Sequence, residues 1–319
     1  MSTTKCKMTT AIKDSLGKIC FVPCGKCSGC LNRRASAWSF RLMQEEKASD
    51  TAYFITLTYA TQHACITRNG YLSTKKSDLQ KYFRSVRDDH RYRKSKNKSI
   101  KYFAVGEYGG KIKRPHYHVL LFNGQLDIMF SKKDIALLKM SNFDGQQRVI
   151  SKHWTKGHVT VGTVSGASVG YVMKYISEPV KNFKINDDRE RPFSIMSNGL
   201  GIGYCTQESL LWHHEDMLNR MYVNVGDGKK ATMPRYYKDK FYHKKEREQI
   251  KKHVEIKLVD QLLEDILYHY HADEQSTKYH NKKEAHKFDL QKNFNNIKKL
   301  RKCKRSRKLL SLTSSKETV

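Results

Sequence analysis

Bulky and β-branched side chains recur at alternate positions in four short segments of the chain, a pattern typical of half-buried β-strands. The four segments are residues 53–59, 101–105, 116–122 and 159–161. Gly109 and Gly110 lie between the second and third segments and predict a turn that joins them. We therefore expect these two strands to form a hairpin.

Three other segments carry apolar residues at helical spacing. They are residues 31–48, 75–89 and 167–177, and the last of them cannot continue past Pro179. We read the order of the elements as β-α-β-β-α-β-α, in which the strands follow each other too closely for a doubly wound parallel sheet. The pattern predicts an α+β fold with a central antiparallel sheet flanked by helices.

Composition narrows the class of protein. The chain has 319 residues, of which 38% are hydrophobic and 29% charged, and this balance excludes both a membrane protein and a plainly disordered one. The longest apolar run near the middle, Val119–Phe122, is far too short to span a bilayer, and the amino terminus lacks the apolar stretch of a secretory signal. We expect no membrane partner and a reducing cytoplasm, where the eight cysteines are thiols or metal ligands.

Charge points to the kind of partner. Lysine and arginine outnumber aspartate and glutamate by 61 to 31, which gives a formal net charge of +30. This excess favours nucleic acid, because cations that neutralise phosphates release condensed counterions; a membrane surface, the ribosome or a solvated basic surface would explain the charge equally well. Eight of the eleven residues 298–308 are basic, and we predict that they form an arm that contacts the DNA backbone.

His116 and His118 are the sharpest chemical signal in the sequence. Side chains two apart on a strand project from the same face, so both imidazoles can reach one divalent ion. Glu107 lies on the other side of the predicted turn, and a hairpin would return its carboxylate towards the two rings. Two imidazoles and one carboxylate suit Mg²⁺ or Mn²⁺ and phosphoryl chemistry. The alternative is that one ring packs in the core and the other is solvated.

Tyr171 and Tyr175 lie four apart in the predicted helix 167–177, so both hydroxyls can address the same phosphate. Lys174 places a cation between them. The competing interpretation is an aromatic pair buried against the sheet. Together with the histidines, the tyrosines describe a phosphodiester transesterification, in which a tyrosinate attacks phosphorus and the DNA 3′-hydroxyl leaves. The covalent bond to the protein conserves the phosphodiester energy.

Several short motifs occur in a characteristic order and separation. They are Pro23–Cys27 with Cys30, Trp38 and Arg41; Phe54–Tyr59; Gly106–Gly109 with Arg114–His118; Tyr171–Tyr175; and Pro234–Tyr237. From about residue 22 to residue 237 the chain resembles the replication initiator proteins of gokushovirus-type microviruses, which belong to the HUH endonucleases. One departure is Leu200 in the segment Ser197–Gly203, where a proline is expected.

The resemblance implies an HUH nickase domain over residues 51–226, between a cysteine cluster with a helix in residues 1–50 and a basic helical or flexible extension in residues 227–319. The site residues carried over by motif are Tyr171 and Tyr175 as nucleophiles and His116, His118 and Glu107 as metal ligands. We add the hypothesis that Lys174 assists at the phosphate.

The resemblance also implies a reaction and its partners. The protein would nick the phage origin, as single strand or in the supercoiled replicative form, through a 5′-phosphotyrosine, and leave a 3′-hydroxyl that primes rolling-circle synthesis. The second tyrosine would cleave the regenerated origin, and the released strand would be religated to a circle. The implied partners are the host helicase and DNA polymerase, in the host bacterial cytoplasm.

Four cysteines cluster near the amino terminus: Cys20, Cys24, Cys27 and Cys30. Four thiolates can close a tetrahedral zinc site, but ligands this close in sequence make a cramped knuckle unless Cys6 replaces one of them. Free thiols are the equal alternative. The first three cysteines also have the spacing found in radical enzymes that hold an iron-sulfur cluster, although no repeated β-α units follow them.

Two function classes besides the nickase therefore stay open. One is that iron-sulfur radical enzyme. The other is a non-catalytic basic DNA- or RNA-binding protein, in which the histidines and tyrosines pack together or stack on bases. A covalent protein–DNA adduct would separate the nickase from both.

Overall fold

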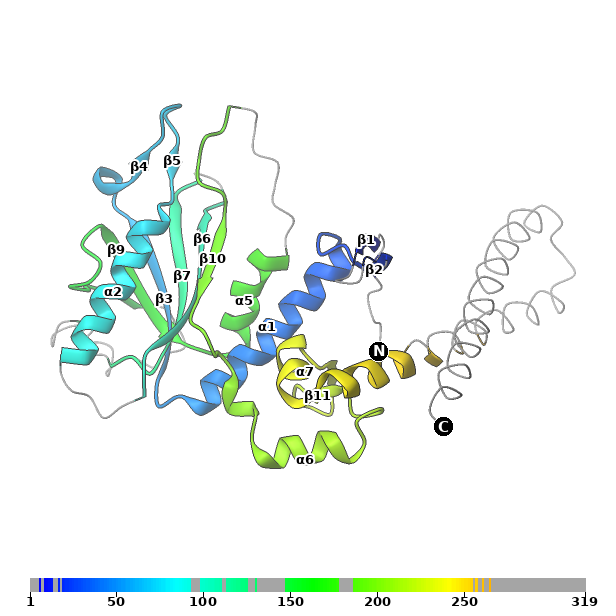
Figure 1. The fold of residues 1–319 in the computed structure, drawn as a ribbon. Coiled ribbons are helices and arrows are strands. Elements are labelled where there is room, and N and C mark those ends of the chain that lie inside the picture. The colour runs from blue at the N-terminus through cyan, green and yellow to red at the C-terminus, as the bar shows by residue number, and fades with distance from the viewer. Residues whose placement is uncertain are drawn as a thin grey trace, which may run out of the picture. The chain divides into compact units, whose positions relative to one another are not determined.

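The fold is that of a computed structural model, which describes residues 6, 9–13, 17, 19–92, 98–110, 113–125, 130, 147–177, 186–254, 256, 257, 260 and 264. Contacts divide the chain into two units, Met1–Phe241 and Tyr242–Val319. The elements below belong to the first unit (Figure 1). In the second unit, residues 244–254 are helical. The basic segment 298–308 lies outside the described residues, and the predicted division at residues 50 and 226 stays a prediction.

A six-stranded antiparallel sheet forms the centre of the first unit. Its strands lie in the order β10-β6-β7-β3-β9-β8. Their bounds are Ala52–Tyr59 for β3, Lys101–Tyr108 for β6, Pro115–Phe122 for β7, Gln147–Val149 for β8, Gly157–Thr163 for β9 and Phe193–Met196 for β10. The four predicted strands and the antiparallel arrangement are confirmed. The pattern missed β8 and β10, the two short strands at the edges.

The helices and hairpins around the sheet complete an α+β fold. The α-helices are α1 (Ser28–Ala48), α2 (Lys76–Tyr92), α5 (Gly166–Ser177), α6 (Gln207–Glu215) and α7 (Arg235–Phe241), and two 3-10 turns are η1 (Thr61–His63) and η2 (Ile202–Tyr204). Three two-stranded pairs are β1 (Thr9–Lys13) with β2 (Ile19–Pro23), β4 (Cys65–Ile66) with β5 (Leu72–Ser73), and β11 (Tyr222–Asn224) with β12 (Lys230–Thr232). The helix that the predicted order places between β7 and β9 falls in a segment that is largely outside the described residues.

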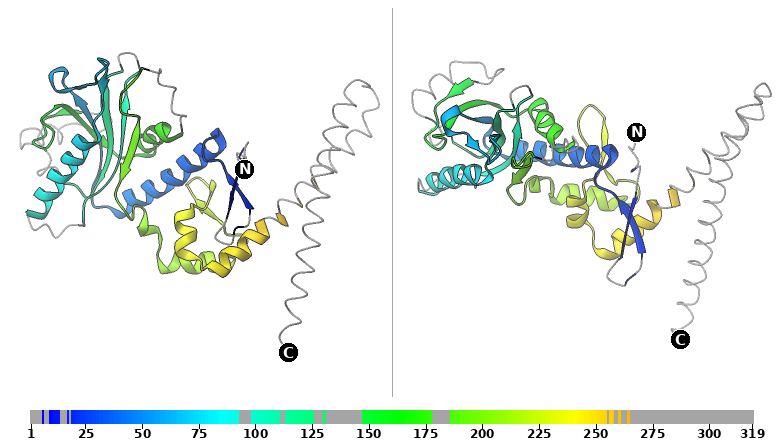
Figure 2. Two further views of the ribbon diagram at one scale, coloured as in Figure 1. Left: turned by 45° about the horizontal axis from the view of Figure 1, so that its top comes forward. Right: turned by 90° about the horizontal axis from the view of Figure 1, so that it is seen from above.

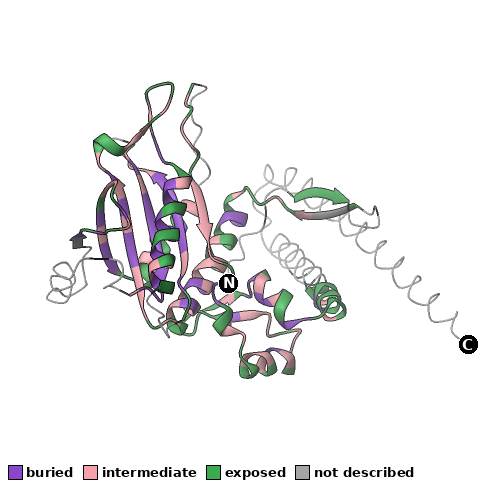
Figure 3. Cartoon of the chain, turned by 60° about the vertical axis from the view of Figure 1, so that its left-hand side comes forward, coloured by how far each residue is buried: buried purple, intermediate pink, exposed green. Residues whose placement is uncertain are grey.

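The sheet is covered on both faces, because alternate side chains of each strand point to opposite sides. Ile55 and Leu57 of β3 are fully buried in a core with Leu79 and Phe83 of α2. Phe54 points the other way, into a second core to which α1 and α5 contribute. Figures 1 and 2 show α2 on one side of the sheet and α1 with α5 on the other. Figure 3 shows the central strands as largely buried, so the sheet is a rigid platform.

A buried polar network joins the α2 side of the sheet to the start of α2. The Tyr59 hydroxyl lies 2.7 Å from that of Tyr117 and donates to Asp78 Oδ2 at 2.9 Å. The Tyr117 hydroxyl also donates to the Lys75 carbonyl at 2.9 Å and accepts from the Lys75 amide at 2.8 Å. Burial raises the pKa of both tyrosines, so both stay protonated and available as donors.

On the other side of the sheet, Arg41 of α1 ties the segment around Leu200 to α7. Its guanidinium lies between two aromatic rings, 4.0 Å from the centroid of Trp38 and 3.8 Å from that of Tyr236. Its Nε and Nη2 donate to the Leu200 carbonyl at 3.1 and 3.0 Å. Leu200 is fully buried in the core that α1 and α5 share. At the position where the family pattern has proline, this chain therefore has a core residue whose carbonyl is held by Arg41.

The neighbouring Gly201 lies directly against α1. Its φ of 76° is in the left-handed region, and an added Cβ would lie 2.7 Å from the Arg41 carbonyl oxygen. Its amide donates to Glu45 Oε2 at 2.8 Å, and its carbonyl accepts from the Tyr237 hydroxyl at 2.8 Å. Lys101 of β6 pairs with the buried Glu45 at 2.8 Å. We call Arg41, Glu45, Gly201 and Tyr237 with their partners the α1 clamp.

Candidate active site

Glu107, His116 and His118 meet on the α1 side of the sheet, at the end of the β6–β7 hairpin. In the hairpin register Glu107 lies opposite His116, and His118 is two residues further along the same face. Glu107 Oε1 is 2.7 Å from His116 Nε2 and 3.0 Å from His118 Nε2. The structure thus brings together the three residues that the sequence predicts as ligands. That they bind a metal stays a prediction.

The other ring nitrogen of each histidine has its own partner. His116 Nδ1 lies 3.0 Å from the Arg114 carbonyl, so it carries the proton and donates. His118 Nδ1 lies 3.0 Å from the Thr56 hydroxyl on β3. Both Nε2 atoms consequently face the Glu107 carboxylate, and either shared protons or a cation must separate these electron-rich atoms. The donor set of two imidazoles and one carboxylate fits a divalent cation.

The electrostatics of the three groups reflect both burial and pairing. Burial opposes ionisation of Glu107, but hydrogen bonds from His116 and His118 outweigh it and lower the pKa of its carboxyl. Burial also disfavours the charged form of His116, and its hydrogen bonds to Glu107 and the Arg114 carbonyl reverse this and raise its pKa. His118 is more deeply buried, so its pKa is lowered despite the same carboxylate. Glu107 is therefore an anion beside a neutral His118 at pH 7.

Tyr171 and Tyr175 of α5 face the same site. The Tyr175 hydroxyl donates to the Tyr171 hydroxyl at 2.8 Å. The His118 ring centroid is 5.0 Å from that of Tyr171 and 5.8 Å from that of Tyr175. Tyr171 is 44% exposed, which contradicts a pair fully buried against the sheet. Lys174 is exposed on the same helix. The two hydroxyls can thus reach a ligand from solvent.

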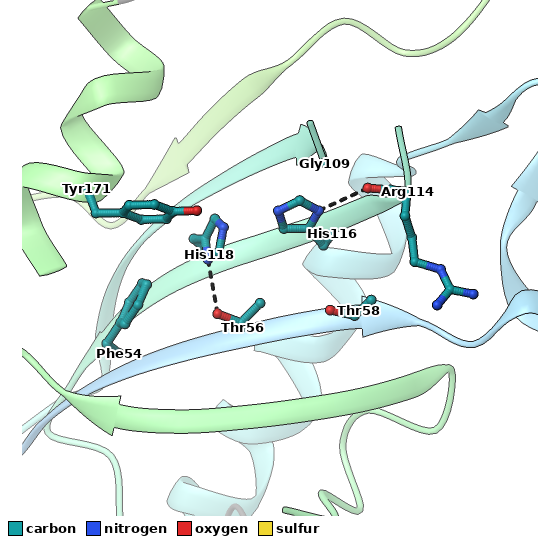
Figure 4. A pocket seen from close by; sticks show the side chains of 8 residues that line it. All are labelled: Phe54, Thr56, Thr58, Gly109, Arg114, His116, His118 and Tyr171. Carbon is teal, nitrogen blue, oxygen red and sulfur yellow. Dashed lines mark hydrogen bonds between the residues drawn. The ribbon is translucent and has the colours of Figure 1, made fainter. Parts of the chain in front are cut away.

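A pocket of about 420 Å³ opens over the histidines. Figure 4 shows Tyr171 extending from α5 towards His118 above the strands. The lining residues are Phe54, Thr56, Thr58, Gly109, Arg114, His116, His118 and Tyr171. Sequence reasoning gave no role to Thr56, although the period-2 pattern of β3 carries the signal: Thr56 and Thr58 alternate with the buried Leu57 and must face the opposite side of the sheet.

Comparison with known proteins assigns the family. The family model of the replication-associated protein ORF2 matches residues 52–180. The curated proteins that match are also replication-associated proteins of phages. The chain belongs to the family of phage replication-associated proteins. The matched region holds the proposed ligands and both tyrosines, whereas the cysteine cluster and α7 lie outside it. No solved structure matches.

Three relatives show the extent of the similarity. The replication-associated protein VP4 of Bdellovibrio phage phiMH2K is 28% identical over 72% of this chain and 69% of its own length. The ORF2 protein of Spiroplasma virus 4 is 30% identical over 68% of this chain and 66% of its own. The ORF4 protein of Chlamydia phage 1 is 24% identical over 68% of this chain and 53% of its own. The similarity therefore extends over 53% to 69% of the length of these family members.

A second cluster of potential ligands lies at the start of α1. The sulfur atoms of Cys6, Cys24, Cys27 and Cys30 all lie within 4.8 Å of one another. The side chain of Cys20, which the sequence pattern placed in this cluster, lies outside the described residues. Within the described part of the chain, no helix is long and apolar enough to cross a membrane.

Proposed function

We propose that this protein initiates phage DNA replication as a site-specific single-strand endonuclease with strand-transfer activity. One observation carries the proposal: the Glu107–His116–His118 group and the two tyrosine hydroxyls face the same open pocket. Family membership supports the role in replication, and the geometry supports the chemistry. The net charge of +30 supports DNA as the substrate.

The proposed reaction is an exchange of one phosphodiester for another. The phenolic oxygen of a tyrosine attacks phosphorus and loses its proton, the bond from phosphorus to the 3′-oxygen breaks, and that oxygen takes up a proton. The products are a 5′-phosphotyrosine and a free 3′-hydroxyl. The number of phosphodiester bonds is unchanged, so the reverse reaction rejoins DNA without an external energy source.

Glu107, His116 and His118 are the residues that would hold a Mg²⁺ or Mn²⁺ ion. Such an ion polarises a phosphate oxygen when bound. Thr56 and the Arg114 carbonyl orient the two imidazoles towards it, because each occupies the ring nitrogen that faces away from Glu107. The platform is a β-hairpin buried against two helices, which keeps these side chains in place before DNA binds.

The two tyrosines would act in turn. One holds the 5′ end of the nicked strand while the other cleaves the regenerated origin, and the released strand is then closed to a circle. Their hydroxyls are 2.8 Å apart, which is close enough to serve one phosphate position. Lys174, one turn along α5 from Tyr171, would contribute positive charge at that phosphate. The free 3′-hydroxyl would prime the host DNA polymerase, with a host helicase opening the duplex in the bacterial cytoplasm.

The test is formation of a covalent adduct. The protein is incubated with Mn²⁺ and overlapping single strands that together cover the genome encoding this chain, and a denaturing gel is searched for a protein–DNA species. We expect one strand to form an adduct. Absence of any adduct from the wild type on every strand would leave a non-catalytic nucleic-acid-binding protein as the better interpretation.

Variants assign the roles. Tyr171→Phe with Tyr175→Phe should abolish the adduct, and Tyr92→Phe is the matched control because Tyr92 is 88% exposed on α2, on the other side of the sheet. Loss of the adduct in one single variant would make the other tyrosine structural. His118→Ala should bind DNA but no longer cleave it, and unchanged cleavage would refute its assignment as a ligand.

A further inference from the structure

The hairpin of β1 and β2 has no core of its own. All five residues of β1, Thr9–Lys13, are exposed, and β2 is its one partner among the described strands. An isolated two-stranded hairpin is marginally stable at best in water. Small elements that cannot bury enough apolar surface are held by disulfides or metal ions. The chain carries cysteines at both ends of this hairpin.

The register of the hairpin brings its two ends together. Thr9 pairs with Pro23, so Cys6, three residues before Thr9, lies next to Cys24. Cys6 Sγ is 3.6 Å from Cys24 Sγ and 3.8 Å from Cys27 Sγ. Four sulfurs placed about 2.3 Å from a zinc ion at tetrahedral angles are about 3.8 Å apart. The two distances match this value and are far longer than the 2.05 Å or so of a disulfide.

We propose that one zinc ion is bound by four cysteines at this place: Cys6, Cys24, Cys27 and Cys30. The zinc cross-links the two ends of the β1–β2 hairpin to the first turn of α1. Cys20 is not a ligand. It lies within β2 opposite Ile12, and four residues of extended strand place its Cα roughly 13 Å from that of Cys24.

The surroundings of the four sulfurs suit a thiolate-bound metal. The Cys24 amide donates to Cys6 Sγ and the Cys27 amide to Cys24 Sγ, both at 3.3 Å, which orients two of the sulfurs. Arg33 Nη2 lies 4.0 Å from Cys30 Sγ. A zinc ion with four thiolates has a net charge of about −2, and a nearby guanidinium offsets part of it.

The start of α1 is consistent with the same charge. Cys27 occupies the N-cap position, where its side chain makes no capping hydrogen bond, and the first turn contains no acidic residue. The first turn of a helix favours negative charge, and here Cys27 and Cys30 supply it as thiolates. Binding releases the four thiol protons to solvent as the four Zn–S bonds form. The zinc therefore also stabilises the amino-terminal end of the longest described helix.

The site has a consequence for the proposed nickase. The loop that it holds contains Gly25 and Lys26, which line a second pocket of about 480 Å³ together with Arg34 of α1 and Tyr175 of α5. Zinc would keep Lys26 beside the second tyrosine, where its charge can meet a DNA phosphate. The zinc site itself does not depend on that function, so its test needs no DNA.

The test measures metal in the full-length protein. Protein produced in zinc-supplemented medium is desalted, and zinc and iron are measured by mass spectrometry. To exclude zinc at the histidines, Co²⁺ is exchanged in and the thiolate-to-cobalt charge-transfer band is recorded, since only cysteine ligands give it. We expect one thiolate-bound metal per chain and no iron. A wild type without that band, or with iron instead, would overturn the proposal.

Four variants identify the ligands. Cys6→Ser should lose the band, whereas Cys20→Ser and Cys205→Ser should keep it; the reverse result for Cys6 and Cys20 would refute the assignment. Because misfolding of Cys6→Ser would also remove the band, Cys6→His serves as the rescue, since an imidazole also ligates zinc. Recovery of one metal per chain in Cys6→His, with a shifted cobalt spectrum, supports coordination at position 6. A Cys6→Ser protein that retains stoichiometric metal refutes it.

Discussion

Gly201 offers a quantitative test of the α1 clamp. Its φ is 76°, and an added Cβ would lie 2.6 Å from the Tyr237 hydroxyl oxygen and 2.7 Å from the Arg41 carbonyl oxygen. Real Cβ atoms do not approach backbone oxygens this closely, so Gly201→Ala must push α1 or α7 away. Gly199, two residues earlier, has a φ of 71° and nothing within 4 Å of an added Cβ. The two glycines thus share the backbone strain and differ in the clash.

The two costs follow from these geometries. The left-handed conformation costs alanine about 1–2 kcal/mol, and the smaller entropy of the unfolded alanine chain returns roughly 0.5 kcal/mol, so Gly199→Ala should lose about 1 kcal/mol. Gly201→Ala adds overpacking of about 1–3 kcal/mol and weakens the bond from the Tyr237 hydroxyl by about 1 kcal/mol. We expect a loss of about 3–5 kcal/mol for Gly201→Ala.

Urea unfolding of both variants and the wild type measures the difference. For a domain of this size, each kcal/mol moves the melting temperature by about 2–4 °C, so Gly201→Ala should melt roughly 10 °C lower and Gly199→Ala about 3 °C lower. The urea dependence of the unfolding free energy should be the same in all three. Equal losses in the two variants would refute the clash as the reason that position 201 requires glycine.

Three further predictions test other parts of the structure. Thr56→Val keeps the shape but removes the hydroxyl that is 3.0 Å from His118 Nδ1, and it should weaken Mn²⁺ binding about 10–100-fold in calorimetry; unchanged affinity would exclude an orienting role. Lys101→Met leaves the buried Glu45 carboxylate without its cation and should cost about 3–5 kcal/mol in urea unfolding, part of which Glu45→Gln in the same chain recovers; strictly additive losses would argue against the pair. Lys26→Ala and Arg34→Ala should each lower the slope of log affinity for single-stranded DNA against log salt by about 0.7, and an unchanged slope would place the DNA elsewhere.

The active-site strands could be predicted because their information is local. Alternation in β6 and β7, together with the Gly109–Gly110 turn, brings Glu107 within reach of His116. The helical spacing of Tyr171 and Tyr175 likewise predicts that their hydroxyls lie on one face, and they are 2.8 Å apart. In both cases the period of a single element or of two adjacent strands decides the geometry.

The rest depends on contacts between residues that are far apart in the chain. Arg41 binds the Leu200 carbonyl across 159 positions, and nothing in the spacing of either segment indicates this pairing. β10 has four residues and pairs with β6 from far along the chain. Cys6 was the weaker choice in the sequence, because Cys20 continues the regular spacing and β1, fully exposed, shows no pattern that would reveal the hairpin.

The elements outside the active site have a common role, which is to position α1. The four cysteines surround its first turn, the α1 clamp holds its carboxyl-terminal half, and α5 with the two tyrosines packs along it. Leu42 of α1 shares its core with Val172 and Met173 of α5, so a displacement of α1 would move the tyrosines relative to histidines that are fixed on the sheet. Clamp variants should therefore lower the rate of strand transfer at temperatures where the sheet is still folded, and leave metal affinity at His116 and His118 unchanged.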